Sequence, residues 1–509
     1  MNITVQKGGI QEVAADAIVV NLFEGVTEPG GATGVVDKAL DGLIGELIAS
    51  GDLQGRLGEA VVLYPRGVIP ARRVIVVGLG KAEAFDLEAV REASAVAVKQ
   101  ARQVGAAQVA TIVHGGGVGG LELAEAAQAL VEGALLALYE YEAPRANRDE
   151  PPRRVDTLIV VEFDETKLSQ IEAGVAAGQA IAHAVYLART LVNQPSNVAT
   201  PAAIAEAAQA MCAEVGLSCR VLEEADMRWL SMGAILAVTQ GASRPAKFIV
   251  IEHHPPDSVP SGQGPVVLVG KGVAFDTGGY SLKSRDNMIT MKMDMAGAAA
   301  VIGAMQAIAR LEIPIPVVGL APLVENVVSA GAYKPGEICT AKNGVSIEVT
   351  NTDAEGRLIL ADALSYADEF KPAAVIDVAT LTGAKVVALG ERINGLFSND
   401  DDLSRRLLAV GHKVGEPLWR MPLDPVYDRQ IKSDVADLKN TGGRAGAAIV
   451  AARFLAHFVG EWPWAHIDVA GSASYSDKPE QTPRSYLVKG ATGIPLRTLV
   501  EYVRSIAAK

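Results

Sequence analysis

The feature that most constrains this fold is a repeated alternation between short apolar runs and longer segments of helical period. In the first part of the chain, the β-branched runs Ala17–Leu22, Val74–Val77 and Leu158–Val161 predict strands. Between them, Val35–Ile48 and Leu121–Leu138 carry the spacing of amphipathic helices. Strands that alternate with helices are typical of an α/β domain, so we predict one here.

The second part of the chain repeats this alternation. The expected strands and helices are Val266–Val269, Val317–Leu320, Val375–Val378, Ala296–Leu311, Leu358–Glu369 and Ala447–Phe458. Such an order predicts a mainly parallel sheet with helices on both faces. Functional groups in such a sheet gather where strands end and loops begin.

A chain of 509 residues exceeds what one hydrophobic core usually fills, so we expect two domains. We predict an N-terminal α/β domain at residues 1–164, a linker helix at 165–192 and a larger catalytic α/β domain at 193–509. The polar, proline-bearing segment Ala143–Arg154 is expected to be an exposed loop near the edge of the first domain.

Composition and charge exclude several classes of protein. The formal net charge of −13 argues against nucleic acid as a general partner. Cys212, Cys219 and Cys339 are too scattered for a disulfide framework or a thiolate zinc site, and we expect all three to be reduced and buried. The chain begins without a signal-peptide pattern, and it has no uninterrupted apolar run of membrane-spanning length. We therefore predict a cytoplasmic protein with no membrane partner.

The glycine-rich stretch Val266–Lys283 does not match the common phosphate-binding motifs. A P-loop needs Ser or Thr after its lysine, whereas Gly272 follows Lys271 here. The dinucleotide fingerprint also fails, because no glycine stands at position 275. A serine hydrolase is disfavoured as well, since the chain lacks a G-x-S-x-G elbow.

The histidines give a weaker signal. His253 and His254 precede a proline-rich stretch and lack partners at metal-ligand spacing, so we expect both at the surface. The glycine-rich segment His114–Gly120 is expected to be a turn of the first domain.

The sequence NTDAEGRL places Asp353, Glu355 and Arg357 on alternate residues. In an extended segment these side chains would share one face, where two carboxylates repel each other unless a cation lies in front of them. Further charged residues lie near predicted strand ends of the same domain, namely Lys271, Asp276, Lys283 and Asp294. Carboxylates that converge without histidine or cysteine suit Mn²⁺, Mg²⁺ or Zn²⁺.

Five segments of the second part resemble the leucyl aminopeptidase family, the di-metal cytosolic exopeptidases. These segments are KGVAFDTGGYSLK, MKMDMAGAAA, NTDAEGRL, DVATLTGA and WAHIDVAG. The sequence departs from the family pattern at Thr277, where serine is expected, and at Ala296, where glycine is common. The resemblance implies a metal-dependent aminopeptidase that removes N-terminal leucine, methionine and other residues from peptides through a water activated by two metals.

The same resemblance implies a ligand set for two divalent ions, Mn²⁺ or Zn²⁺ above all. Asp276 and Glu355 would bridge the two ions, Lys271 and Asp294 would complete one site, and Asp353 would complete the other. Two dications would explain why neighbouring carboxylates share one face.

The remaining roles implied by the resemblance concern catalysis and substrate binding. Lys283 would polarise the scissile carbonyl, and Arg357 would hold a bicarbonate ion that carries a proton to the leaving amine. The residues implied to line the pocket and hold the substrate backbone are Met291, Thr380, Leu381 and Gly383, with Ala470 and Ala473 bordering the pocket.

Two other function classes stay open at this stage. Some members of the family act as DNA-binding accessory proteins, although the acidic net charge counts against that role here. A different two-metal hydrolase, such as a phosphoesterase, could use Lys271 and Lys283 to bind phosphate. The resemblance also implies a homohexamer.

Overall fold

The computed structural model divides the chain into two compact units. One comprises Met1–His183 with Pro483–Val488, and the other comprises Ala184–Thr482 with Lys489–Lys509. The structure describes residues 1–116, 119–143, 153–255, 264–476, 481 and 484–507. Most of the loop predicted at residues 143–154 lies outside them.

The 26-residue helix α5, Leu168–Asn193, runs from the first unit into the second. The domain boundaries given above stay a prediction, although α5 occupies most of the predicted linker.

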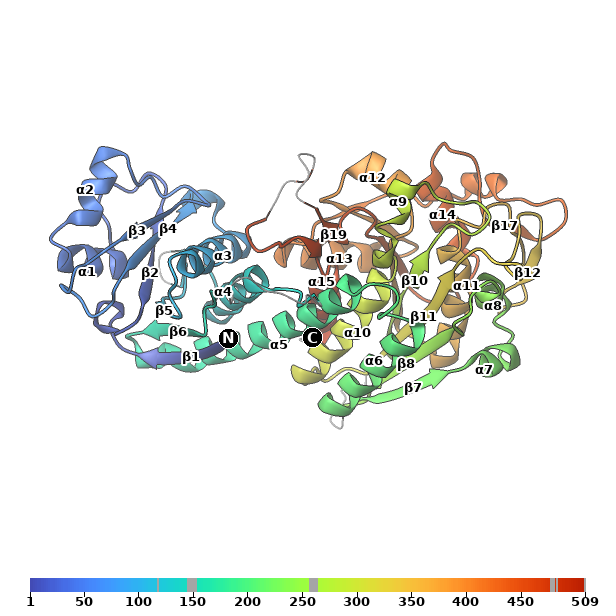
Figure 1. The fold of residues 1–509 in the computed structure, drawn as a ribbon, viewed down its shortest axis with the longest axis horizontal. Coiled ribbons are helices and arrows are strands. Elements are labelled where there is room, and N and C mark those ends of the chain that lie inside the picture. The colour runs from blue at the N-terminus through green and yellow to red at the C-terminus, as the bar shows by residue number, and fades with distance from the viewer. Residues whose placement is uncertain (117–118, 144–152, 256–263, 477–480, 482–483, 508–509) are drawn as a thin grey trace. The chain divides into compact units, whose positions relative to one another are not determined.

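The first unit is built on a six-stranded sheet in the order β1-β6-β5-β2-β4-β3 (Figure 1). Neighbouring strands are parallel except for the antiparallel pair β3 and β4. The strands are β1 Asn2–Lys7, β2 Ala17–Phe23, β3 Ala60–Leu63, β4 Val74–Gly80, β5 Gln108–Thr111 and β6 Thr157–Glu162. The three strands predicted in this part are confirmed as β2, β4 and β6.

One predicted helix of the first unit proves to be two. The segment Val35–Ile48 lies in α1, Gly31–Ala39, and α2, Leu43–Ser50. Between them, Asp41 and Gly42 adopt the left-handed region with φ of 58° and 84°, which ends a right-handed helix. This unit also contains α3, Leu87–Gln103, and α4, Leu123–Leu138.

The second unit contains a nine-stranded sheet in the order β16-β15-β18-β14-β9-β11-β8-β7, with β10 paired to β11. Its pairings are mainly parallel, as predicted, and the antiparallel ones are β11 with β8, β15 with β18, and β7 with β8. The strands are β7 Ser218–Leu222, β8 Lys247–His253, β9 Val266–Gly270, β10 Gly272–Asp276, β11 Val317–Asn326, β14 Ala374–Ala379, β15 Asn394–Ser398, β16 Leu418–Arg420 and β18 Trp464–Asp468.

Helices cover both faces of this sheet. The helices are α6 Pro201–Val215, α7 Glu224–Trp229, α8 Gly233–Thr239, α9 Arg285–Met288, α10 Ala296–Arg310, α11 Gly356–Ala367, α12 Gly383–Leu389, α13 Asp401–Lys413, α14 Ala447–Ala456 and α15 Leu496–Ala507. Small sheets join β12 Ile338–Thr340, β13 Ser346–Glu348 and β17 Leu438–Lys439, and join β19 Ser474–Tyr475 to β20 Gly490–Ala491.

The central strand β9 shows how the sheet directs side chains to its two faces. Val267 and Val269 pack in one buried cluster with residues of α8, α11 and α14. Helix α10 contacts β9 from the other face, where its Gly297 approaches Gly270. Because side chains alternate along a strand, Lys271 continues the row of Val267 and Val269 and lies on the face covered by α11.

Within the described residues, one helical segment, Glu165–Asn193, has the length and composition of a membrane span. In this protein 61% of its most apolar window is buried. Buried core helices commonly reach the same length and hydropathy.

Candidate metal centre and active site

The candidate site lies where strands of the second unit end. Lys271 separates β9 from β10, Asp276 is the last residue of β10, and Thr380 directly follows β14. In the segment NTDAEGRL, Glu355 has φ −74° and ψ −34°, and α11 begins at Gly356. The acidic residues therefore lie in a turn that enters a helix, and not in an extended segment.

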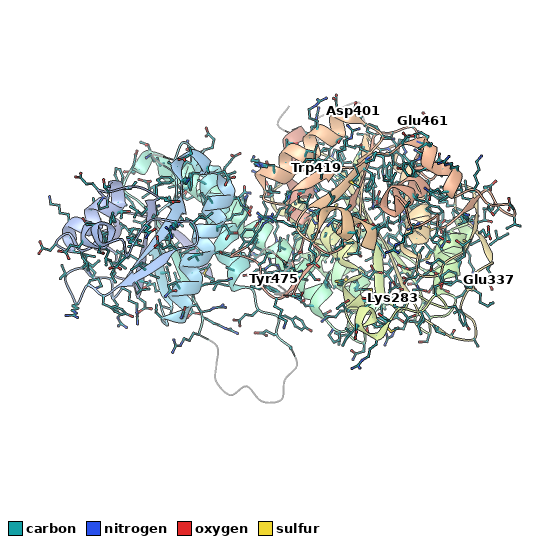
Figure 2. All side chains as sticks on the ribbon, turned by 90° about the horizontal axis from the view of Figure 1, so that it is seen from above. Lys283, Glu337, Asp401, Trp419, Glu461 and Tyr475 are labelled. Atoms are coloured by element: carbon teal, nitrogen blue, oxygen red, sulfur yellow. The ribbon has the colours of Figure 1, made fainter. Side chains whose placement is uncertain are left out.

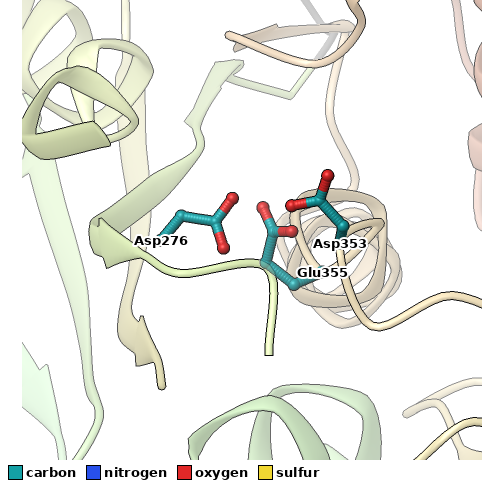
Figure 3. A group of neighbouring side chains, drawn as sticks. All are labelled: Asp276, Asp353 and Glu355. Carbon is teal, nitrogen blue, oxygen red and sulfur yellow. The ribbon is translucent and has the colours of Figure 1, made fainter. Parts of the chain in front are cut away.

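This turn still brings the carboxylates together. Asp276, Asp353 and Glu355 each offer an oxygen that lies within 4.8 Å of the others, and Figure 3 shows the three carboxyl groups gathered at one point. Asp276 and Glu355 are buried, whereas Asp353 is half-buried. Three acidic groups at this spacing can hold a metal ion.

Lys271 lies beneath the start of α11 and is buried. Its Nζ is 2.8 Å from Asp294 Oδ1 and 2.9 Å from Glu355 Oε1, and it donates to the carbonyl oxygen of Thr380 at 3.1 Å. A Cβ on Gly356 would lie 2.4 Å from Lys271 Cε, so a glycine is required there for the lysine to fit.

Lys283, labelled in Figure 2, pairs with the other two carboxylates of the cluster. Its Nζ is 2.8 Å from Asp276 Oδ2 and 2.5 Å from Asp353 Oδ1. The exposed fraction of the Lys283 side chain is 15%, whereas that of the Lys271 side chain is 4%. Four ion pairs thus form two groups, Lys271 with Asp294 and Glu355, and Lys283 with Asp276 and Asp353.

Burial and repulsion by neighbouring carboxylates hold Asp276, Asp294 and Asp353 away from their usual pKa. Burial raises the pKa of Asp294 to about 8, even though Lys271 opposes the shift. Burial also raises the pKa of Asp276 and Asp353. For Lys271, burial alone would lower the pKa, but the surrounding carboxylates outweigh it and leave the pKa raised. A centre with four carboxylates and two lysines has an excess of negative charge that divalent cations would balance.

Unpartnered buried oxygens show that these residues fit metal ions. Among the described residues, neither Asp294 Oδ2 nor Glu355 Oε2 has a hydrogen-bond partner, and both are buried. A buried carboxylate oxygen without a donor is costly unless a cation or a donor faces it. Carboxylate oxygens in this number suit hard or borderline divalent ions such as Mn²⁺ and Zn²⁺.

Arg357 lies in the first turn of α11 and is buried. Its Nη1 donates to the carbonyl oxygen of Asn440 at 2.7 Å, and its Nε has no partner within the described part of the chain. Burial lowers the pKa of Arg357 to about 10, which leaves it charged at neutral pH. A buried guanidinium with a free N–H can bind a small anion.

Of the residues predicted to bind substrate, Thr380 and Met291 contact Asp294 directly. Thr380 Oγ1 donates to Asp294 Oδ1 at 2.6 Å, and Asp294 N donates to the carbonyl oxygen of Met291 at 3.3 Å. Leu381 is half-buried next to Thr380, and Gly383 is exposed at the start of α12.

Two expectations about other residues prove wrong. His253 is buried and its Nε2 lies 2.8 Å from the carbonyl oxygen of Ile313, whereas His254 is exposed as expected. Cys212 is buried, but Cys219 and Cys339 are only partly so, because each lies in a strand near a sheet edge.

Sequence reasoning missed Asn326, the last residue of β11. Its Nδ2 donates to Asp276 Oδ1 at 2.8 Å and to the carbonyl oxygen of Thr352 at 2.9 Å, so it ties β10 to the acidic turn. The predicted strand ended at Leu320. The observed strand β11 continues to Asn326, which pairs with Asp276. A strand predicted to this full length would have placed Asn326 beside Asp276.

Comparisons with known proteins agree with this geometry. Residues 186–500 match the catalytic domain of the cytosol aminopeptidase family, and residues 19–147 match its N-terminal domain. The chain belongs to the cytosol aminopeptidase family. Members of this family are metal-dependent aminopeptidases, and so is this chain. The matches give no support to the DNA-binding or phosphoesterase alternatives.

Related sequences and structures cover nearly the whole chain. A probable cytosol aminopeptidase of Syntrophotalea carbinolica is 45% identical, with 92% of each chain covered, and one of Roseiflexus castenholzii is 41% identical, with 99% of each covered. Among solved structures, a tomato leucine aminopeptidase mutant matches with a TM-score of 0.86 and 32% identity, covering 99% of this chain and 96% of its own. The bottromycin maturation enzyme BotP in complex with Mn matches with a TM-score of 0.84 and 34% identity, covering 97% of this chain and all of its own.

Proposed function

We propose that this chain removes N-terminal residues, leucine and methionine among them, from peptides at the centre formed by Lys271, Asp276, Asp294, Asp353 and Glu355. The observation that carries the proposal is the convergence of buried carboxylates with unpartnered oxygens at the strand ends of the second unit. These residues would hold two divalent ions, and Mn²⁺ is supported by the ion named for the structural relative BotP.

Two metals bound here would lower the pKa of a bridging water and supply a nucleophile for the peptide bond. Asp276 and Glu355 stand between the two lysines and are proposed as the shared ligands. Lys271 and Asp294 are proposed as ligands on one side, and Asp353 on the other. In this arrangement Lys271 has to be neutral, which the positive charge of a neighbouring ion would favour.

Lys283 and Arg357 are proposed as the catalytic residues. Lys283 keeps a charged, partly accessible Nζ at the edge of the cluster, where it can donate to the oxygen of the scissile carbonyl. Arg357 has a buried Nε free of partners among the described residues, which supports the binding of bicarbonate as a proton carrier. Thr380, Leu381, Gly383 and Met291 are proposed to hold the substrate.

We also propose that the protein is a cytoplasmic homohexamer. The names of its relatives, cytosol aminopeptidases, support the compartment, and the family resemblance supports the assembly. Size-exclusion chromatography with light scattering tests the assembly, and a monomeric mass would contradict it.

Metal removal tests the function. We expect chelation to abolish hydrolysis of a leucyl arylamide and added Mn²⁺ or Zn²⁺ to restore it, while an aryl phosphate is not hydrolysed in either state. Full leucyl arylamide hydrolysis by protein shown to contain no metal would refute the proposal.

A further inference from the structure

Two neighbouring loops of the second unit follow the parallel strands β14 and β18. We call residues 380–382 the β14 loop and residues 469–471 the β18 loop. The strands pair in register, with Ala379 opposite Asp468, so both loops leave the sheet at the same edge. Asp468 is therefore the last strand residue before one loop and lies beside the start of the other.

The carboxylate of Asp468 connects the two loops. Its Oδ1 accepts from Leu381 N at 3.1 Å and from Ala470 N at 3.0 Å, and its Oδ2 accepts from Thr382 Oγ1 at 2.7 Å. Asp468 is fully buried. A buried carboxylate with both oxygens engaged fixes the positions of its donors much more strongly than an exposed one does.

Lys385, in the first turn of α12, adds a second connection. Its Nζ donates to the carbonyl oxygen of Ala470 at 2.8 Å and to that of Gly390 at 3.1 Å, and its backbone N–H donates to Thr382 Oγ1 at 3.1 Å. This lysine is buried and lies near Asp468. A buried lysine is costly, so its position here depends on these carbonyl partners.

The β14 loop is also joined to the metal centre at its other end. Thr380 donates through Oγ1 to Asp294 Oδ1 at 2.6 Å and accepts from Lys271 Nζ at 3.1 Å. The β14 loop thus contacts two proposed metal ligands through Thr380 and contacts Asp468 through Leu381 and Thr382.

We propose that Asp468 is a positioning residue for peptide binding, which holds the β14 loop and the β18 loop at a fixed distance from the metal centre, with Lys385 as its partner. The inference rests on the proposed function, in which Thr380 and Leu381 hold the substrate backbone. Asp468 does not touch the substrate itself in this scheme. A displacement of a substrate-holding loop by about 1 Å can cost on the order of a hundredfold in rate.

The test is Asp468→Asn, which keeps the shape of the side chain but turns one acceptor oxygen into a donor. Either the Leu381 and Ala470 amides lose their acceptor, or the Thr382 hydroxyl has to accept from the NH₂ group instead of donating, and both orientations lose the charge that strengthens these hydrogen bonds. We expect KM for a leucyl arylamide to rise by at least roughly tenfold, because a displaced loop binds the substrate backbone less well. Two metal ions per subunit should be retained.

Asp377→Asn is the matched control. Asp377 is also a fully buried carboxylate on the same sheet, but it accepts from Trp464 Nε1 at 2.6 Å and lies 2.5 Å from His466 Nδ1, in the middle of β14 and β18. It bonds to strand residues and not to the two loops. A general loss of packing would affect both variants alike, whereas we expect the large rise in KM only for Asp468→Asn.

Three results would overturn the proposal: an Asp468→Asn protein with unchanged KM, an equal rise in KM for Asp377→Asn, or loss of metal from Asp468→Asn. If Asp468→Asn does not fold, Lys385→Met decides, since it removes the donor to Ala470 and should raise KM with both metals retained. An unchanged KM in a folded Lys385→Met protein would then refute the proposal. Failure of the proposed function is distinguishable, because the wild-type protein itself would lack metal-dependent hydrolysis.

Discussion

Replacing Lys283 by alanine gives the sharpest test of the site. The change removes an Nζ that lies 2.8 Å from Asp276 and 2.5 Å from Asp353, but it removes no proposed metal ligand. Both carboxylates lose a competing cation, so their capacity to hold metal ions should not fall. We therefore expect Lys283→Ala protein to contain two metal ions per subunit.

The expected magnitude follows from the position of Lys283 at the accessible edge of the cluster. If its Nζ stabilises the developing oxyanion, its loss removes one donor from the transition state. Such deletions lower kcat by roughly 10²- to 10³-fold, or about 2.7–4 kcal/mol, with a smaller effect on KM.

Lys271 provides the contrasting case. Its side chain is almost completely buried between Asp294 and Glu355, so Lys271→Ala should lose one metal together with activity. Lys271→Arg should not restore metal binding, because a guanidinium stays protonated and cannot be a ligand. Elemental analysis and steady-state kinetics on the three variants decide between the roles. A metal-depleted Lys283→Ala protein, or a fully loaded and active Lys271→Arg protein, would refute this assignment.

Three further predictions concern two residues at the site and one buried acidic residue of α11. Gly356→Ala places a Cβ 2.4 Å from Lys271 Cε, so the substitution should displace that lysine and lower the metal content measured by elemental analysis. Full metal occupancy with full activity would contradict this prediction. Asn326→Ala removes one of the two amide donors to Asp276 Oδ1 and leaves that of Gly278, so it should weaken metal binding by roughly 10- to 100-fold in a metal titration; an unchanged affinity would exclude an orienting role. Burial raises the pKa of Asp362 from 3.8 to about 7, so the folded state favours its protonated form. The resulting stabilisation, on the order of 4 kcal/mol, is fully present below pH 4 and is lost as pH rises through 7. The free energy of unfolding, measured with denaturant from pH 4 to 8, should show this decline, and the decline should be weaker in Asp362→Asn. Equal pH profiles for both proteins would refute the prediction.

The sequence predicted the elements of the sheet better than the connections at the site. Runs such as Val266–Val269 and Val375–Val378 are apolar and β-branched because both faces of β9 and β14 are buried, so local composition reveals them. The break between α1 and α2 was missed, because Asp41 adopts a left-handed conformation that its residue type does not require.

The candidate residues were found from motifs, but their arrangement was not. The sequence left open whether NTDAEGRL is extended or a turn, because the start of α11 depends on contacts of Glu355 with Lys271 and of Arg357 with Asn440, which are far away in the chain. Asn326 and Asp468 were not assigned any role. Asn326 contacts Asp276, 50 residues away, and Asp468 contacts Leu381 and Thr382, 87 and 86 residues away, so only the strand order reveals these contacts.

The double attachment of Thr380 has a thermodynamic consequence. Its side chain and carbonyl group contact Asp294 and Lys271, while its backbone belongs to the loop proposed to hold the peptide. Two ligands that order the same segment influence each other reciprocally, so the factor by which bound metal tightens peptide binding equals the factor by which bound peptide tightens metal binding. If bound metal tightens peptide binding, a peptide-saturated enzyme should accordingly retain its metals at a higher chelator concentration than the free enzyme does.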